Sequence, residues 1–227
     1  MGEIVNILGI ETATTACAIG LATGDERIAL VVDGNRHHTE ALMPGVRDLL
    51  ARANLRARDI DRVVVDRGPG LYTGLRVGIA TAIGFALAAN CEIVGVTSLE
   101  LLAAGAFRAG VRGELLAAVD GRRGEVFVQS FTLTDGVHST SEPAVARASD
   151  VVARWSSGPV TVTGDGASRY EEAFGHLDRA EIFDQPVPPV VEALALAEDR
   201  AADETVTPLY LREADAVANF STRERSS

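Results

Sequence analysis

The sequence contains no lysine, and all 21 basic residues among its 227 residues are arginines. This absence excludes mechanisms that need a lysine amine, such as a Schiff base, a pyridoxal attachment or a Walker A lysine. Cysteine is also scarce, because only Cys17 and Cys91 occur and they lie far apart in the sequence. Neither a disulfide framework nor a cysteine-based zinc site is therefore expected.

Long apolar runs and excess positive charge are missing as well. No run of apolar residues approaches the roughly 18 that a membrane helix needs. The start, Met1-Gly2-Glu3, lacks the basic region of a signal peptide, so we expect a cytoplasmic protein without a membrane segment. The 32 acidic residues give a net charge of -11, which repels phosphate backbones. We do not expect this chain alone to be the main holder of a nucleic acid.

Folded structure is expected throughout most of the chain, because 47% of the residues are apolar and 23% are charged. Three apolar runs separated by short turns open the sequence, at residues 4–10, 17–22 and 28–32. This pattern predicts three strands joined by hairpin turns. Dinucleotide-binding folds begin with a βαβ unit instead.

Two predicted helices follow these strands. Leu42, Val46 and Leu49 recur at helical spacing in an amphipathic helix that ends near Asn54. The second helix, residues 74–90, is apolar on nearly all sides, so either the domain or a partner must cover it. Further strands are predicted at residues 63–65, 92–96, 115–119, 126–132 and 160–163. Further helices are predicted at residues 97–108, 149–155, 167–174 and 190–201, with a disordered tail at 219–227.

A glycine-rich loop joins the strand at 63–65 to the apolar helix. Free backbone N–H groups in such a loop can bind an anion at the positive end of a helix. The same glycines serve tight turns and close helix packing, and the loop has neither a lysine nor the spacing G-x-G-x-x-G. We therefore favour the structural interpretation over phosphate binding for Gly68, Pro69, Gly70, Thr73 and Gly74.

The turn between the first two strands is a weaker candidate. Glu11, Thr12 and Thr14 offer an acid and two hydroxyls that could hold a nucleotide, but threonine-rich hairpin turns are common. His37 and His38 have no third residue spaced to complete a metal site. No nucleophile motif such as G-x-S-x-G and no H-E-x-x-H appears. Composition and spacing alone show no active site.

The whole chain resembles the TsaB family, formerly YeaZ. Residues 68–78 read GPGLYTGLRVG, which is similar to the family's GPGSFTGLRIG, with Leu71 and Tyr72 replacing Ser and Phe. Further matches occur at residues 10–13, 38–44, 94–99, 120–126 and 208–212. The resemblance implies an α/β fold of the actin-like ATPase (ASKHA) type, with a first domain at 1–105 and a reduced second domain at 106–227.

The resemblance also implies a noncatalytic role without a cofactor. The family is a degenerate paralogue of its catalytic partner TsaD, which binds a metal through two histidines. Ser98 and Leu102 stand at these two positions here. Because an alcohol and an isobutyl group cannot replace two imidazoles on a metal, we expect neither a metal nor catalytic residues.

The partners that the resemblance implies are TsaD, in a heterodimer, and a TsaE-type ATPase in a larger complex. Together they form N6-threonylcarbamoyladenosine at position 37 of tRNAs reading ANN codons. This chain would activate TsaD and contact tRNA only indirectly, through the complex. In the absence of TsaD it would form a homodimer. Either ordinary core packing or a partner interface accounts for the apolar helix residues, and the candidate contacts are Leu42, Val46, Leu49, Arg76, Ile79, Ile83 and Leu87.

Two rival functions belong to other classes. The actin-like fold usually holds a nucleotide between two domains, so an independent ATPase or phosphotransferase is the main alternative. Two residues of the first turn argue against it, because the phosphate loop of such enzymes has an aspartate and a glycine where this chain has Glu11 and Ala13. A metallopeptidase is the third possibility, but the sequence offers no set of ligands or nucleophile for one.

Overall fold

The computed structural model describes residues 5–32, 38–155, 158–177 and 179–212. Its first sheet has five strands in the order β3-β2-β1-β4-β5. β2 pairs antiparallel with both β1 and β3, whereas β4 runs parallel to β1 and β5 runs parallel to β4. The predicted opening of three hairpin-linked strands is confirmed. The strands are β1 (Ile7–Glu11), β2 (Cys17–Thr23), β3 (Glu26–Val32), β4 (Arg62–Asp66) and β5 (Glu92–Val96).

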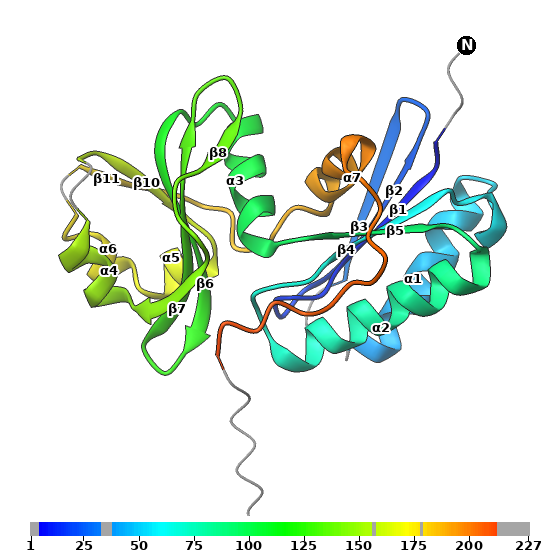
Figure 1. Cartoon of the computed structure of the whole chain (residues 1–227), viewed down its shortest axis with the longest axis horizontal. Helices are drawn as coiled ribbons and strands as arrows, with labels where there is room; N and C mark the ends of the chain where they lie inside the picture. Colours follow the sequence, from blue (N-terminus) through cyan, green and yellow to red (C-terminus); the bar gives the residue numbers. More distant parts are fainter. Residues whose placement is uncertain (1–4, 33–37, 156–157, 178, 213–227) are drawn as a thin grey trace, which may run out of the picture.

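Helices cover both faces of this sheet (Figure 1). α1 (His38–Arg52) and α2 (Tyr72–Ala89) pack on one face, and the short 3-10 helix η1 (Ala57–Asp59) follows α1. α7 (Val190–Asp199) packs on the other face. It lies close because Gly9 and Gly20 have no side chains there, and an added Cβ on either would come within 3.0 Å of α7. Alternating strand residues supply the two layers of core.

The second sheet repeats the strand order of the first. Its order is β11-β10-β6-β7-β8, with β6, β7 and β8 antiparallel and with β10 and β11 parallel to β6. If the short strand that pairs with β7 outside this order is left out, both sheets place the third, second, first, fourth and fifth of their strands side by side. The predicted actin-like α/β fold is confirmed. The strands are β6 (Gly113–Arg122), β7 (Glu125–Leu133), β8 (Val137–Ser139), β10 (Val160–Thr163) and β11 (Ala180–Phe183), and β9 (Ala144–Arg147) pairs with β7.

The helices of the second half are short, apart from the one that joins the two sheets. α3 (Ser98–Arg108) covers one face of the second sheet, and its Leu101 also contacts the core under α7. The other face is covered by α4 (Ala148–Arg154), α5 (Asp165–Arg169) and α6 (Glu171–Phe174). The predicted helix at 167–174 is therefore two helices. The second domain is reduced in its helices and not in its sheet.

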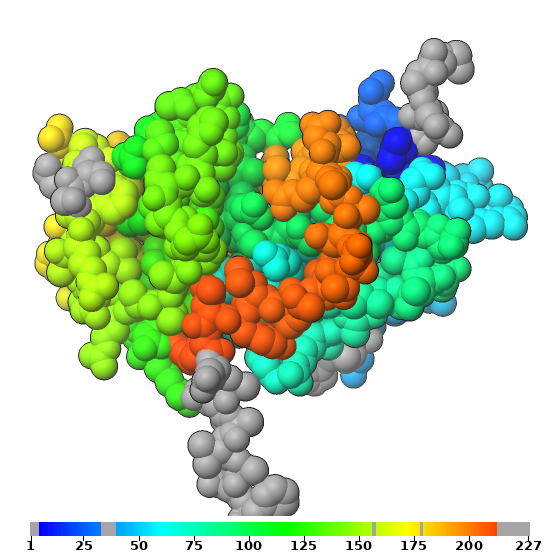
Figure 2. Space-filling model, viewed as in Figure 1, coloured from blue at the N-terminus to red at the C-terminus, as the bar shows by residue number. Residues whose placement is uncertain are grey.

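The C-terminal part of the chain returns to the first domain. α7 lies in the half that was predicted as the second domain, yet it packs on β1 and β2. The segment after α7 then runs along the outside of the first domain (Figures 1 and 2). The boundary at 105 and 106 stays a prediction, and the first domain has to include α7. The predicted disordered tail at 219–227 lies outside the described residues.

The helix α2 is longer and more apolar than the sequence led us to expect, because no apolar run of about 18 residues was expected. By length and composition alone it could cross a membrane, because Tyr72–Ala89 has a mean hydropathy of 1.3 over 18 residues. It packs on the first sheet instead, through Leu75, Ile79, Ala82 and Phe85. Only 39% of the helix is buried by this packing. One side of an apolar helix therefore remains uncovered by the described chain.

Candidate functional site

Two buried acids lie side by side at the carboxyl ends of neighbouring strands. Glu11 ends β1 and Asp66 ends β4, directly after the paired residues Ile10 and Val65. Both acids are 0% exposed. The Ser98 hydroxyl, at the start of α3, donates to Asp66 Oδ2 at 2.8 Å, and the Gly68 N–H donates to Oδ1 at 2.7 Å. In open α/β sheets this edge is the usual place for a ligand.

Burial raises the pKa of both acids, because a charged carboxylate is poorly stabilised away from water. The pKa of Asp66 rises from 3.8 to about 7. The pKa of Glu11 lies well above its ordinary 4.5, first because of burial and second because of the charge on Asp66. Glu11 Oε1 accepts a hydrogen bond from the Ala13 N–H at 2.7 Å, whereas Oε2 is buried without a partner. Glu11 therefore holds its proton more tightly than an exposed glutamic acid does.

The glycine-rich loop packs directly on the threonine turn beside these acids. The Thr12 hydroxyl donates to the Gly74 carbonyl at 2.9 Å, and the Leu71 N–H donates to the Ala13 carbonyl at 2.7 Å. A Cβ on Gly70 would lie 2.2 Å from the Ala13 oxygen. These glycines permit close backbone contact, which is the structural role that the sequence favoured.

The loop and the turn together leave no open phosphate cradle at the predicted positions. Glu11 and Thr12 are 0% exposed and Thr14 is 3% exposed. Gly68, Pro69 and Gly74 are buried, Gly70 is half-buried and Thr73 is exposed on α2. Gly68 also has a φ of +100°, a conformation that favours glycine. Within the described ranges, no group of three or more His, Cys, Asp or Glu residues could hold a metal ion.

The predicted contact residues of α1 and α2 divide into two sets. Leu42, Val46, Leu49 and Ile79 are at most 5% exposed and lie in the core between the helices and the first sheet. The sequence left core packing and a partner interface open for these four residues, and in the structure they pack against their own sheet. Ile83 is half-buried, and Arg76 and Leu87 are exposed. Leu87 is exposed to 78%, more than any other large apolar side chain among the described residues.

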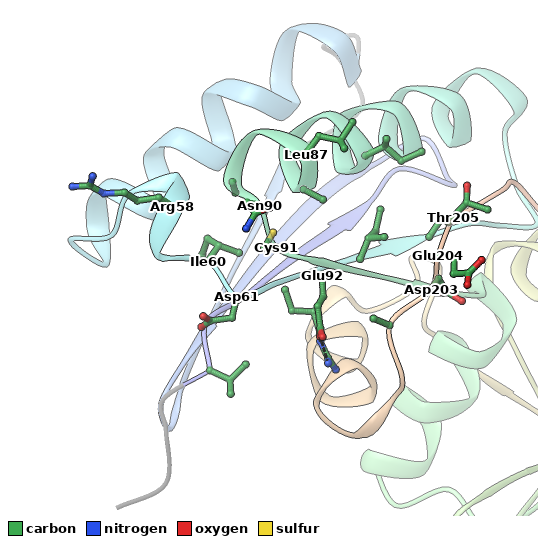
Figure 3. Close-up of a pocket in the computed structure, with 18 residues that line it drawn as sticks. Arg58, Ile60, Asp61, Leu87, Asn90, Cys91, Glu92, Asp203, Glu204 and Thr205 are labelled. Atoms are coloured by element: carbon green, nitrogen blue, oxygen red, sulfur yellow. Dashed lines mark hydrogen bonds and ion pairs between the residues drawn. The ribbon is translucent and has the colours of Figure 1, made fainter.

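A groove of about 900 Å³ lies at the C-terminal end of α2 (Figure 3). Ile83 and Leu87 from α2, Cys91 and the segment 202–206 contribute to its lining. Asp61, Glu92, Asp203 and Glu204 add acids to its rim. The sequence did not indicate that the segment after α7 would reach α2. The pairing of that segment with β5, through the Asp203 N–H and the Ile93 carbonyl at 2.9 Å, depends on the tertiary fold.

The comparisons with known proteins agree on one family. The family model TsaD, described as tRNA N6-adenosine threonylcarbamoyltransferase, matches residues 32–216. The protein of Escherichia coli named tRNA threonylcarbamoyladenosine biosynthesis protein TsaB is 39% identical over 123 residues. That match covers 54% of this chain and 53% of the E. coli protein, so it spans about half of each. The Bacillus subtilis protein of the same name is 28% identical over 95% of this chain and 98% of its own length.

A mycobacterial relative and a solved structure extend the match to nearly the full chain. An uncharacterized protein of Mycobacterium tuberculosis is 34% identical over 94% of this chain and 95% of its own length. The crystal structure of YeaZ from Pseudomonas aeruginosa superposes with a TM-score of 0.80 at 26% identity. It covers 91% of this chain and 100% of the YeaZ chain. The chain is therefore a member of the TsaB (YeaZ) family, within the group that the TsaD family model describes.

Proposed function

We propose that this chain is a noncatalytic subunit that binds TsaD and activates it in forming N6-threonylcarbamoyladenosine at position 37 of tRNAs reading ANN codons. The observation that carries the proposal is the uncovered apolar side of α2, where Leu87 is 78% exposed. A contiguous apolar surface, as opposed to a single exposed apolar residue, marks an interaction site. Arg76, Ile83 and Leu87 remain the contact residues of the proposal.

Two residues of α3, Ser98 and Leu102, support a role without catalysis. The resemblance places Ser98 and Leu102 where TsaD has its two metal-binding histidines. The Ser98 hydroxyl is bound to Asp66, and Leu102 is 0% exposed in the core under α3. Neither side chain is free to act on a substrate. The transfer of threonylcarbamoyl is therefore assigned to TsaD.

The other partners follow from the same proposal. A TsaE-type ATPase joins the complex, and tRNA is contacted only through it, in keeping with the net charge of -11. In the absence of TsaD, the uncovered side of α2 pairs with a second copy of this chain. The complex works in the cytoplasm, where tRNA modification takes place.

The proposal is tested by mixing this chain with TsaD from the same organism. Light scattering should show a one-to-one complex, and threonylcarbamoylation of tRNA should need both chains. Leu87→Asp should weaken the complex by about 30-fold, the effect of losing an interface hot spot. Val31→Asp is the matched control, because Val31 is 59% exposed on the edge strand β3, away from α2.

Three outcomes would contradict the proposal. Equal TsaD activity with and without this chain would exclude activation, and equal weakening by both variants would exclude α2 as the contact. Micromolar binding of ATP with Mg²⁺ in calorimetry, followed by hydrolysis, would establish the alternative of an independent ATPase or phosphotransferase.

A further inference from the structure

The segment after α7 touches both domains, and we call residues 200–212 the strap. Its first part pairs with β5. The Asp203 N–H donates to the Ile93 carbonyl at 2.9 Å, and the Gly95 N–H donates to Asp203 Oδ2 at 2.7 Å. Val206 is 4% exposed in the core between the first sheet and its helices α1 and α2. This part of the strap therefore belongs to the first domain.

The strap stays on the first domain as far as Tyr210. The Leu209 N–H donates to the Arg67 carbonyl at 2.7 Å. The Tyr210 hydroxyl accepts a hydrogen bond from Arg76 Nε at 3.0 Å, and its ring stacks on that of Tyr72 with the centroids 5.2 Å apart. Backbone, ring and hydroxyl thus all fix the position of Tyr210 relative to β4 and α2.

The last two residues of the strap contact the second domain instead. Leu211 packs against the core between α3 and the second sheet. Arg212 forms an ion pair with Glu125 at the start of β7, and its guanidinium carbon lies 5.9 Å from the centroid of the Phe127 ring. The side chains of Arg212 and Glu125 are 28% and 34% exposed. Their attraction is therefore screened less by water and salt than that of a fully exposed pair.

The chain crosses between the domains twice before the strap. One crossing leads from β5 through Thr97 into α3, and the other leads from β11 through residues 184–189 to α7. Two such crossings act as a hinge, because they leave one rotation free about the line that joins them. Figure 1 shows the end of the strap below both crossings. A contact away from the hinge line restricts this rotation.

A cavity of about 360 Å³ lies between facing parts of the two domains. Arg67 and Leu196 line it from the first domain, Gln129 and Phe131 from the second, and Leu209 from the strap. Domains that do not pack tightly over a large apolar interface are expected to move relative to each other. Packing of the facing surfaces at this cavity therefore does not fix the angle between the domains.

We propose that the strap locks the second domain at one angle to the first, and that release of Leu211 and Arg212 frees a rotation about the two crossings. This inference goes beyond the proposed function and does not depend on it. The lock consists of one apolar contact and one ion pair, so a change of two side chains should open it. The rest of the strap should stay on the first domain, where its backbone is hydrogen-bonded.

The distance between two spin labels, measured by pulsed electron paramagnetic resonance, reports the angle between the domains. Arg47→Cys is exposed on α1 and Ala153→Cys is exposed on α4, so each domain carries one label. Cys91→Ser removes the half-buried native thiol, and Cys17 is 1% exposed and should not react. An excess of unlabelled chain removes the distances between labels on different copies.

The chain with an intact strap should give one narrow distribution of distances. Leu211→Ala combined with Arg212→Ala should broaden the distribution about twofold, because the hinge rotation becomes free. Glu125→Gln removes the ion pair alone and should broaden it less. Arg56→Ala is the matched control, because it breaks the ion pair with Asp59 inside the first domain, and it should leave the width unchanged.

Three outcomes would overturn the lock. The first is a distribution of equal width for the double variant and the intact strap. The second is a broad distribution for the intact strap, which would show that the strap does not hold one angle. The third is equal broadening by Arg56→Ala, which would show that loss of any ion pair has this effect. Circular dichroism spectra that match the wild type exclude unfolding as the cause of broadening.

Discussion

In the first domain, the edge of the sheet where β1 and β4 end and the outer side of α2 differ in how they are covered. At the sheet edge, Glu11, Asp66 and Thr12 are fully buried, and the backbone of the glycine loop contacts Thr12 and Asp66. On α2, Gly84 borders open space and Leu87 is 78% exposed. The acids and the threonine, which are residue types common in active sites, are thus buried inside the fold, whereas the uncovered surface of α2 is apolar. This difference favours a binding role over catalysis.

The same strand order also places acids at the corresponding edge of the second sheet. Asp120 lies in β6 and Asp165 follows β10, and the Asp120 N–H donates to Asp165 Oδ1 at 2.8 Å. Here Arg122 and Arg169 lie within 3.0 and 3.3 Å of Asp120. In the first domain no cation lies within ion-pair distance of Glu11 or Asp66 among the described residues. The topology places acids at the same edge of both sheets, but only those of the second sheet have arginines within ion-pair distance among the described residues.

The largest expected effect concerns Gly70 in the glycine-rich loop. Gly70→Ala should lower the free energy of unfolding by about 3 kcal/mol, because its Cβ would lie 2.2 Å from the backbone oxygen of Ala13, which has little room to move. Denaturant unfolding measures this loss. A change of less than about 1 kcal/mol would mean that the loop and the turn are not tightly packed.

The next effect concerns the buried acids and their pH dependence. Because the pKa of Glu11 is raised in the folded state, the folded chain binds its proton more tightly than the unfolded chain does. The stability that this proton provides is present below pH 4.5 and is lost as pH rises toward the folded pKa. Glu11→Gln keeps Oε1 for the Ala13 N–H and removes the titration. The stability of Glu11→Gln relative to the wild type should therefore increase from pH 5 to pH 8.

Unfolding curves at these two pH values check this prediction, with Glu26→Gln as the control for loss of an exposed acid. A constant difference between Glu11→Gln and the wild type would show that Glu11 has the same pKa in both states. A difference that falls with rising pH would show that the folded state favours the charged form instead.

The smallest effect has the opposite sign and concerns α2. Gly84→Ala should raise the free energy of unfolding by about 1 kcal/mol, because alanine favours a helix and its Cβ meets nothing within 4 Å. Compared with Gly70→Ala, the same substitution then changes stability in opposite directions in the two regions. Destabilisation by Gly84→Ala would show that Gly84 already packs closely within this chain.

The positions of several strands and helices could be predicted from short sequence patterns. The strands at 92–96 and 160–163 have the predicted bounds. Thr97 and Glu100 have the spacing of a capping box, and both of its hydrogen bonds form between them at the start of α3. The sequence favoured a structural role for the loop glycines, in tight turns and close helix packing. Their contact with Ala13 could not be deduced, because the two segments are far apart in sequence.

Tertiary features account for what the sequence did not predict. The short strands β8, β9 and β11 have three or four residues each, too few for a clear period. The core position of Leu42 and Val46 was left open, because an apolar helix face fits a sheet or a partner equally well. The stacking of the Tyr72 and Tyr210 rings could not be predicted either, because the two residues are far apart in sequence and meet only in the folded chain.

The most direct test of the docking side of α2 is the affinity of Gly84→Trp for TsaD. A tryptophan at Gly84 enters open space in the free chain, so stability should be close to that of the wild type. It should block a close helix contact and weaken the complex by at least about 30-fold. Ala153→Trp, exposed on α4 in the second domain, should bind TsaD normally. Full affinity of Gly84→Trp for TsaD would contradict the assignment of this face as the interface.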